Sequence, residues 1–397
     1  MALFAIGSTL AKCSSAKPLL AVTSVSPILS ATIVCKALRD VKDKPKPYPY
    51  KDKRYRLWTA WYDRSTHRFD ENSKIIIVEG AVASGKTALA KQLAEDLDMY
   101  HIPEANMDIK YINPYGYDMR KLDPQLPDSL KSFDEKNFCL DPFHFNVAAF
   151  QMWMYRLRFS VYIDALAHVL STGQGVVMER SPWSDIVFME AMCKNNFISK
   201  EARNVYLEVR RNSLHLLMRP HLVIYLDMPV NVVQQKIKTR GRAHEQNSKA
   251  LTTAFLQDIE DFYKTKYLPE ITTHAELLMY DWSEGGDPEV LVEDIERVDF
   301  DKYTKHDAKL KDWRLSKERL WEMNRRLYAD KKARLLRTLV VPNFSAEELV
   351  ANGEDWDTYY KVWYSAPGMQ FAPGYNEEFG DTGLLFKSKT TDKYKPY

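Results

Sequence analysis

The segment Lys74–Thr87, KIIIVEGAVASGKT, constrains the fold of this chain more than any other stretch. It begins with the β-branched run Ile75–Val78, which is too short for a membrane span and suits a buried strand. The pattern Gly-x-x-x-x-Gly-Lys-Thr starts at Gly80, and a helical apolar period then continues to Leu97. The glycines let successive backbone N–H groups point inward, and the helix N-terminus adds partial positive charge. The segment is therefore predicted to be a phosphate-binding P-loop.

Each residue of this motif has an expected role in holding a nucleotide. Lys86 is expected to reach the β- and γ-phosphates, and the Thr87 hydroxyl is expected to ligate Mg²⁺. Gly80, Ser84 and Gly85 are expected to form the rest of the phosphate cradle. A chance match in a surface loop is the alternative, but the strand before the motif and the helix after it stand where a P-loop requires them.

Short apolar strands alternate with helical periods as far as about residue 300. Such alternation predicts an α/β fold with a parallel sheet that helices cover on both faces. Ligands of such sheets bind beyond the carboxyl ends of the strands, where Gly80, Glu104 and Glu179 fall. Beyond the P-loop, strands are expected at 99–103, 176–178, 222–226 and 276–280, and helices at 141–171, 199–218, 230–238, from 253, and at 288–297.

Charged residues at the strand ends are candidates for phosphoryl transfer, which needs positioning, charge neutralisation and a base for the attacking hydroxyl. Glu104 is the candidate base, and Arg180 is expected to orient both Glu104 and the acceptor hydroxyl. Glu179 is a candidate to hold Mg²⁺ or its waters, while Arg240 and Arg242 are expected to fold over the phosphates as a lid. Taken singly, a strand-end carboxylate is often only a helix cap, and a pair of arginines is often a solvated face.

The N-terminal 73 residues differ in composition from the predicted α/β domain. Residues 1–39 contain no Asp or Glu and four Lys or Arg, which is typical of a mitochondrial transit peptide. A secretory signal or a transmembrane helix fits less well, because the apolar run 19–34 lies late and is broken by Pro27. Residues 40–73 are rich in Pro, Lys and Tyr, and are predicted to be an extended arm that lies on a surface.

Two other stretches depart from the α/β pattern. Residues 107–140 lose periodicity and hold three prolines, which predicts an insertion or a lid. Between 302 and 337, 13 Lys or Arg stand against five Asp or Glu on a helix-forming sequence. Such a basic amphipathic helix suits an acidic partner or a membrane surface, and it equally suits packing on its own domain. The aromatic segment after Pro342 completes a C-terminal extension, 301–397, and is expected to lie across a partner.

Residues 74–282 resemble the deoxynucleoside kinases of the deoxycytidine and deoxyguanosine kinase branch. The resemblance implies that Gln151, Arg158 and Asp185 line a base pocket and that Glu245 touches the sugar 3′-hydroxyl. On sequence alone, Arg158 and Asp185 equally suit a structural ion pair. A purine (deoxy)nucleotide with Mg²⁺ is the expected ligand. The matching motifs are GAVASGKT, Glu104 in PEAN, Phe150-Gln151, Arg158, Glu179-Arg180-Ser181, Asp185, and the lid Arg240-Gly-Arg242-x-x-Glu245-Gln246, with Ala81 and His244 as departures.

With its ends included, the chain resembles the kinase-like accessory subunits of mitochondrial respiratory complex I. This resemblance implies that the kinase-like domain, 74–300, sits on the matrix side of the inner membrane, peripheral to the bilayer and beside other complex I subunits. FAD has been described for this family, but no motif here predicts a flavin.

Two functions therefore compete. One is a non-catalytic subunit that supports assembly or stability of the complex and retains a nucleotide-binding fold. The other is an active mitochondrial kinase that uses ATP to phosphorylate a deoxynucleoside. The net charge of +2 and pI of about 8.1 give no strong basic field, so nucleic acid is not an expected partner.

Overall fold

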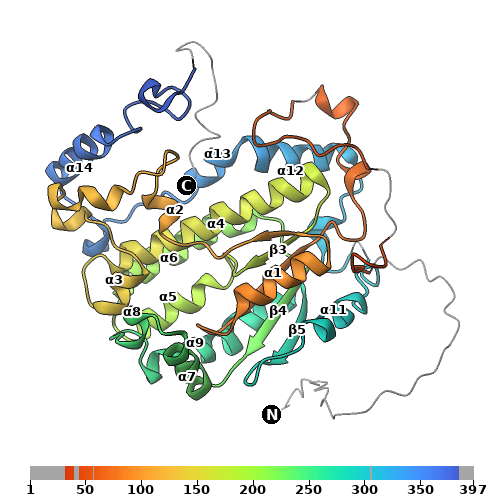
Figure 1. Ribbon diagram of the computed structural model, residues 1–397, viewed down its shortest axis with the longest axis horizontal. Coiled ribbons are helices and arrows are strands. Elements are labelled where there is room, and N and C mark those ends of the chain that lie inside the picture. The colour runs from red at the N-terminus through yellow and green to blue at the C-terminus, as the bar shows by residue number, and fades with distance from the viewer. Residues whose placement is uncertain (1–31, 40–43, 57, 305, 384–397) are drawn as a thin grey trace, which may run out of the picture. The chain divides into compact units, whose positions relative to one another are not determined.

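A five-stranded sheet lies at the centre of the fold (Figure 1). The computed structural model describes residues 32–39, 44–56, 58–304 and 306–383. The strand order is β2-β3-β1-β4-β5, and every neighbouring pair is parallel, which confirms the predicted α/β fold. The strands are β1 (Ile75–Gly80), β2 (Tyr100–Ile102), β3 (Val176–Glu179), β4 (Leu222–Asp227) and β5 (Glu276–Asp281).

Both faces of this sheet are buried, which explains why the central strands are apolar without alternation. Ile75 and Ile77 of β1 pack in one core with α4, α5 and α6, while Ile76 and Val78 pack in a second core with α1, α7 and α11. Each core is therefore a layer of helices against one sheet face (Figure 1). The main covering helices are α1 (Lys86–Asp96), α4 (Val147–Thr172), α5 (Asp185–Lys194), α6 (Lys200–Ser213), α7 (Val230–Arg240), α9 (Thr253–Phe262) and α11 (Pro288–Glu296).

The predicted start of the long helix at Asp141 is wrong, because α4 begins at Val147. Asp141 instead ends a separate helix, α3 (Glu135–Leu140), and its backbone N–H donates to the Asn137 carbonyl over 2.9 Å. The Asp134 carboxylate caps the start of α3 by accepting two backbone N–H bonds of 3.0 Å. The capped helix α3 therefore ends just before Asp141, and residues 141–146, which the sequence assigned to the first turns of α4, form turns between the two helices.

Residues 107–140 contain short helices instead of an unstructured loop, and the C-terminal segment packs against them. Met119, Leu122 and Leu126 share a small apolar core with Ala366. Beside it, helix α14 (Gly353–Ser365) contacts the same stretch (Figure 1). The short helices are α2 (Asp108–Tyr111), η3 (Met119–Gln125), η4 (Asp128–Leu130) and α3.

The outward face of α4 is covered by the basic part of the C-terminal extension. Helices α12 (Glu318–Asp330) and α13 (Lys332–Arg337) lie along α4 (Figure 1). Trp321 and Tyr328 of α12 are buried there, and the Tyr328 hydroxyl donates to the Leu216 carbonyl over 2.9 Å. Of the two alternatives for this helix, packing on its own domain is thus the one observed. Arg319 and Arg326 remain at least partly exposed, whereas Arg325 is buried.

The N-terminal arm joins this extension through a buried ion-pair cluster. Arg325 of α12, fully buried, donates to Asp63 over 2.9 Å, and Arg68 donates to the other oxygen of the same carboxylate over 2.7 Å. The Arg325 guanidinium also lies 3.8 Å from the ring centre of Tyr55. Asp63 is therefore one of the carboxylates that join these two distant regions, beside Asp330, which accepts the backbone N–H of Tyr55 over 2.9 Å, and Glu318, which accepts that of Ser65 over 2.6 Å.

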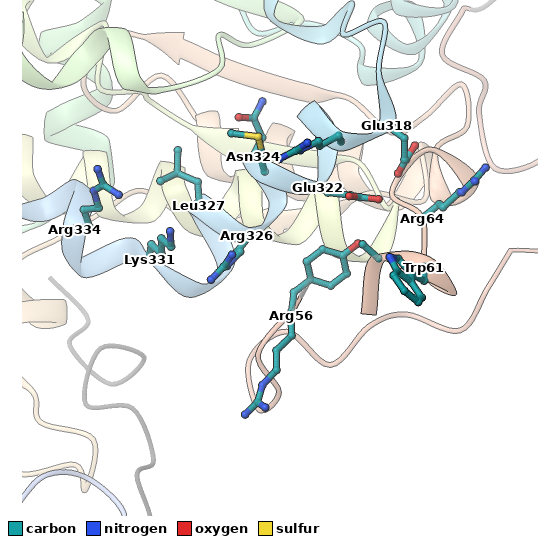
Figure 2. A pocket seen from close by; sticks show the side chains of 14 residues that line it. Arg56, Trp61, Arg64, Glu318, Glu322, Asn324, Arg326, Leu327, Lys331 and Arg334 are labelled. Carbon is teal, nitrogen blue, oxygen red and sulfur yellow. The ribbon is translucent and has the colours of Figure 1, made fainter. Parts of the chain in front are cut away.

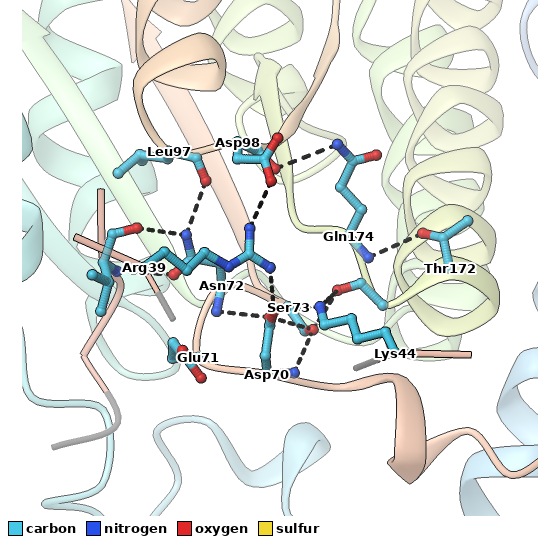
Figure 3. Close-up of polar contacts among 12 residues, drawn as sticks. Arg39, Lys44, Asp70, Glu71, Asn72, Ser73, Leu97, Asp98, Thr172 and Gln174 are labelled. Carbon is cyan, nitrogen blue, oxygen red and sulfur yellow. Dashed lines mark hydrogen bonds and ion pairs between the residues drawn. The ribbon is translucent and has the colours of Figure 1, made fainter. Parts of the chain in front are cut away.

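Part of the predicted transit peptide, residues 32–39, packs on the α/β domain (Figure 3). Ile33 is fully buried in the α1 core, and the Asn72 side chain bonds both the N–H and the carbonyl of Val34, at 2.8 and 2.6 Å. Arg39 donates to Asp98 over 2.8 Å. The rest of that predicted peptide, and residues 384–397 of the extension, lie outside the described residues. Within those described, no helix has both the length and the apolar character needed to cross a bilayer.

Candidate functional site

The P-loop turns sharply at Gly80 and Gly85, two positions where the backbone conformation or a close neighbour disfavours any residue with a side chain. Gly80 ends β1 with φ of 145°, and a Cβ there would lie 2.7 Å from the Leu226 carbonyl oxygen. Gly85 has φ of 83° and directly precedes α1. These left-handed positions suit glycine, and they bring the loop to the N-terminus of α1, where N–H groups remain free for an anion.

The Lys86 side chain is folded back onto the P-loop itself. Its ammonium donates to the Ala81 carbonyl over 2.5 Å and to the Ser84 hydroxyl over 3.2 Å. Burial, aided by the positive charge of Arg180, lowers the pKa of Lys86 to about 7. Both oxygens that accept from the Lys86 ammonium are neutral. Phosphate oxygens are charged and would bind this ammonium more strongly, so Lys86 is well suited to exchange its present partners for a phosphate.

Thr87 and Glu179 meet as the sequence predicts for a magnesium position. The Thr87 hydroxyl donates to the Glu179 carboxylate over 2.6 Å, and His101 of β2 lies 3.2 Å from the other carboxylate oxygen. In the described chain, no group of three or more His, Cys, Asp or Glu could enclose a metal by itself. One hydroxyl and one carboxylate fit Mg²⁺ that is held mainly by water and substrate phosphates.

Glu104 lies beside two buried arginines at the carboxyl edge of the sheet. The Arg180 guanidinium is 2.7 Å from the Glu104 carboxylate, and that of Arg158 is 3.6 Å away. Burial raises the pKa of Glu104, but the positive charges of Arg180, Lys86 and Arg158 outweigh burial, so its pKa lies below the ordinary value. The carboxylate is therefore ionised at neutral pH and can accept a hydrogen bond from a hydroxyl group.

Asp185 organises the predicted base pocket from behind. Its fully buried carboxylate accepts bonds from Gln151 over 2.9 Å, from the Tyr206 hydroxyl over 2.7 Å, and from Arg158. Gln151 and Arg158 border the cavity, whereas Asp185 does not. Arg158 thus both borders the cavity and forms the ion pair with Asp185. The predicted place of Asp185 in the lining is wrong, because its buried carboxylate lies behind Gln151 and Arg158 and holds them.

The predicted lid residues pair with one another. Arg240 donates to both oxygens of Glu245, one of them over 3.0 Å, and Arg242 donates to the same carboxylate over 3.4 Å. Glu245 itself is buried in the short helix α8 (Ala243–Gln246). Arg240 and Arg242, which were predicted to bind phosphate, therefore pair with Glu245, which was predicted to bind the sugar, and all three line the cavity.

Most of these groups line one cavity of about 1050 Å³. The predicted site residues that line it are Ser84, Gly85, Lys86, Thr87, Glu104, Gln151, Arg158, Glu179, Arg180, Arg240, Arg242 and Glu245, and those that do not are Gly80 and Asp185.

The insertion supplies one wall of this cavity. Lys136, Phe138 and Cys139 of α3 line it together with the P-loop. Its volume is ample for a nucleoside and phosphate groups.

Sequence reasoning missed the buried residues that hold Arg180. Glu79 accepts bonds of 3.1 Å from the Ser181 and Tyr263 hydroxyls, and Arg180 donates to Tyr263 over 2.6 Å. The Phe188 ring lies 4.6 Å beneath the Arg180 guanidinium. Glu79 could have been noticed in the sequence, because it is a charged residue in the apolar strand IIIVEG and a buried carboxylate requires hydrogen-bond partners.

Comparison with known proteins identifies the family. The deoxynucleoside kinase family matches residues 76–314. NADH dehydrogenase (ubiquinone) 1 alpha subcomplex subunit 10, mitochondrial, of Mus musculus is 38% identical over 329 residues, covering 82% of this chain and 87% of the mouse protein. The chain belongs to this subunit 10 family.

Other relatives show how the similarity is divided along the chain. The Bos taurus subunit 10 is 37% identical over 327 residues, which is 82% of this chain and 90% of the bovine protein. Deoxyguanosine kinase of Dictyostelium discoideum is 27% identical over 237 residues, which is 59% of this chain and 73% of that kinase. Similarity to the subunit 10 family therefore reaches well beyond the stretch that resembles a kinase.

Proposed function

We propose that this chain is a mitochondrial accessory subunit of respiratory complex I that supports assembly and stability of the complex. The observation that carries the proposal is the 329-residue match to mouse subunit 10, which exceeds the kinase-like span 76–314. Catalysis by a nucleoside kinase would not require the additional matched residues. We further propose import by a transit peptide within residues 1–39 and a place on the matrix side of the inner membrane.

The terminal extensions support a role in assembly because they offer surface to partner subunits. No residue of α14 is buried, and Trp356, Tyr360 and Tyr364 remain 39%, 49% and 57% exposed. The Tyr360 ring stacks on both neighbours, at 5.7 and 6.1 Å between centres. Exposed aromatic rings are common anchors in protein interfaces, so we assign this row to contacts with other complex I subunits.

We also propose that the cavity holds a purine (deoxy)nucleotide with Mg²⁺. Lys86 would neutralise its phosphates, Thr87 and Glu179 would hold the metal or its waters, and Gln151 with Arg158 would face the base. The folded-back Lys86 and the Thr87–Glu179 bond support this assignment. No motif in the chain suggests FAD, and we propose no flavin.

Depletion and rescue test the proposed role. Loss of the chain from mitochondria is expected to lower the amount of assembled complex I, and the wild-type chain is expected to restore it. Unchanged assembly after complete depletion would refute the role. Mass spectrometry of small molecules released from the denatured, purified chain should meanwhile identify a nucleotide.

An active deoxynucleoside kinase is the second candidate, and the close approach of Arg180 to Glu104, 2.7 Å, favours it. This pairing is the one expected if a base must take a proton from an acceptor hydroxyl. Purified chain with ATP, Mg²⁺ and each deoxynucleoside should then yield a monophosphate, and Lys86→Ala should abolish it. Absence of product with every deoxynucleoside would remove this candidate.

A further inference from the structure

A second large hollow lies between the N-terminal arm and helices α12 and α13 (Figure 2). None of the described residues that line it also lines the P-loop cavity. We call this second hollow the arm groove. It measures about 820 Å³, and its walls come from residues 55–64 on one side and 318–334 on the other. Apolar parts of Met323 and Leu327 form part of its floor.

The arm groove carries an excess of positive charge. Its two carboxylates are Glu318 and Glu322, and Glu318 already accepts the backbone N–H of Ser65 over 2.6 Å. In the described structure, none of its cations forms an ion pair with a carboxylate. These six cations are Arg56, Arg64, Arg319, Arg326, Lys331 and Arg334. Six cations without a carboxylate partner in the described chain give this surface a positive potential, which favours binding of an anionic partner.

Aromatic rings stand exposed on the arm side of the groove. Trp58, Trp61 and Tyr62 are 60%, 89% and 78% exposed, and Trp61 lines the groove itself. The turn that carries them is nevertheless anchored, since Thr59 and Ala60 between them are buried. An ordered turn thus holds these rings in water. Exposure of their apolar surface is unfavourable, and a partner that covered the rings would remove this unfavourable hydration.

We propose that the arm groove docks on an anionic phospholipid surface. The cations would contact lipid phosphates, and the indole and phenol rings would lie at the headgroup level, where Trp and Tyr are enriched. An acidic protein fits less well, because all six cations are at least partly exposed and are spread over the arm and two helices. Charges that bind one protein site are usually fixed in paired, desolvated positions. This inference rests on the proposed place of the chain at the inner membrane.

Vesicle flotation with the full-length chain tests the proposal. The chain should float with vesicles of phosphatidylcholine and phosphatidylglycerol but not with phosphatidylcholine alone, and added salt should release it. Each basic residue near an anionic membrane contributes about 1 kcal/mol, so Arg326→Gln with Arg334→Gln should weaken binding roughly 25-fold. Trp61→Ala should weaken binding as well, and tryptophan fluorescence should shift to the blue when wild-type chain binds.

Arg211→Gln with Arg297→Gln is the matched control, because both arginines are exposed and lie outside the arm groove. Every variant keeps the same N-terminal leader, so differences in flotation report on the groove alone. Equal binding of the groove and control variants would overturn the proposal, as would equal binding to neutral vesicles. Absence of vesicle binding together with capture by an acidic peptide would also overturn it. None of these results depends on incorporation into complex I, so the proposed function is tested separately.

Discussion

The buried carboxylate of Asp63 should govern whether the N-terminal arm stays attached to helix α12. Asp63→Ala leaves the guanidinium groups of Arg325 and Arg68, whose side chains are 0% and 4% exposed, without their shared partner. Removal of one member of a buried ion pair typically costs about 3–5 kcal/mol. Arg325 keeps its contact with the Tyr55 ring at 3.8 Å, and a desolvated cation–π contact contributes about 2 kcal/mol. We therefore expect a loss at the lower end, about 3 kcal/mol.

Urea unfolding of the purified chain, followed by circular dichroism, measures this loss. Asp52→Ala is the matched control, since Asp52 lies in the same arm and is exposed. Its free energy of unfolding should remain within about 0.5 kcal/mol of the wild-type value. Hydrogen exchange should accelerate in the arm and in α12 of Asp63→Ala, because these segments lose their buried ion-pair contact and keep only the bonds of Tyr55 to Asp330 and of Ser65 to Glu318.

The same carboxylate predicts a loss of stability in acid. Burial raises the pKa of Asp63, but the hydrogen bonds and charges of Arg68 and Arg325 outweigh burial and hold its pKa below its ordinary value. A lowered folded-state pKa stabilises the fold above the unfolded-state pKa, and this contribution disappears as pH falls through the folded-state value. Asp63→Ala should therefore differ from wild type at neutral pH and converge with it in acid. If Asp63→Ala matched Asp52→Ala at neutral pH, the arm would be held by something other than this cluster.

Three further substitutions have defined outcomes. Asn72→Ala removes the bonds to both backbone groups of Val34; it should cost about 1–3 kcal/mol and speed hydrogen exchange at residues 32–39, and unchanged exchange would contradict it. Gly80→Ala places a Cβ 2.7 Å from the Leu226 carbonyl oxygen and should destabilise the chain by at least about 1–3 kcal/mol in urea unfolding; wild-type stability would refute this steric argument. Lys86→Ala should abolish heat of ATP binding in calorimetry while circular dichroism stays unchanged, and retained binding would show that the cradle is not the nucleotide site.

The parts of the fold that sequence predicted are those encoded by local spacing. The P-loop, the β-branched strands and the meeting of Thr87 with Glu179 follow from motifs that place groups at the carboxyl ends of parallel strands. Gln151 and Arg158 were predicted from the resemblance to the kinases, and the structure places them two turns apart on α4, where both border one cavity. The same resemblance supplied Asp185, which holds Gln151 and Arg158 from behind instead of lining the cavity.

Contacts between distant segments could not be predicted in the same way. Asp63 and Arg325 are 262 positions apart, and neither belongs to a periodic pattern that signals the other. Helix α3 was missed because its six residues need the Asp134 cap and the packing of Phe138 against Phe150 and Phe255 more than intrinsic propensity. The segments η3, η4 and α14 likewise looked irregular, because they pack against one another over a distance in sequence that no local pattern signals.

Native-gel separation of detergent-solubilised mitochondria tests the central claim most directly, because it shows where the chain resides. With an antibody against the chain, the signal is expected to migrate with complex I and to shift when the complex is dissociated. The same band should contain the other complex I subunits. A signal confined to a free, soluble species, with none at complex I, would contradict the proposed role and leave the kinase activity as its function.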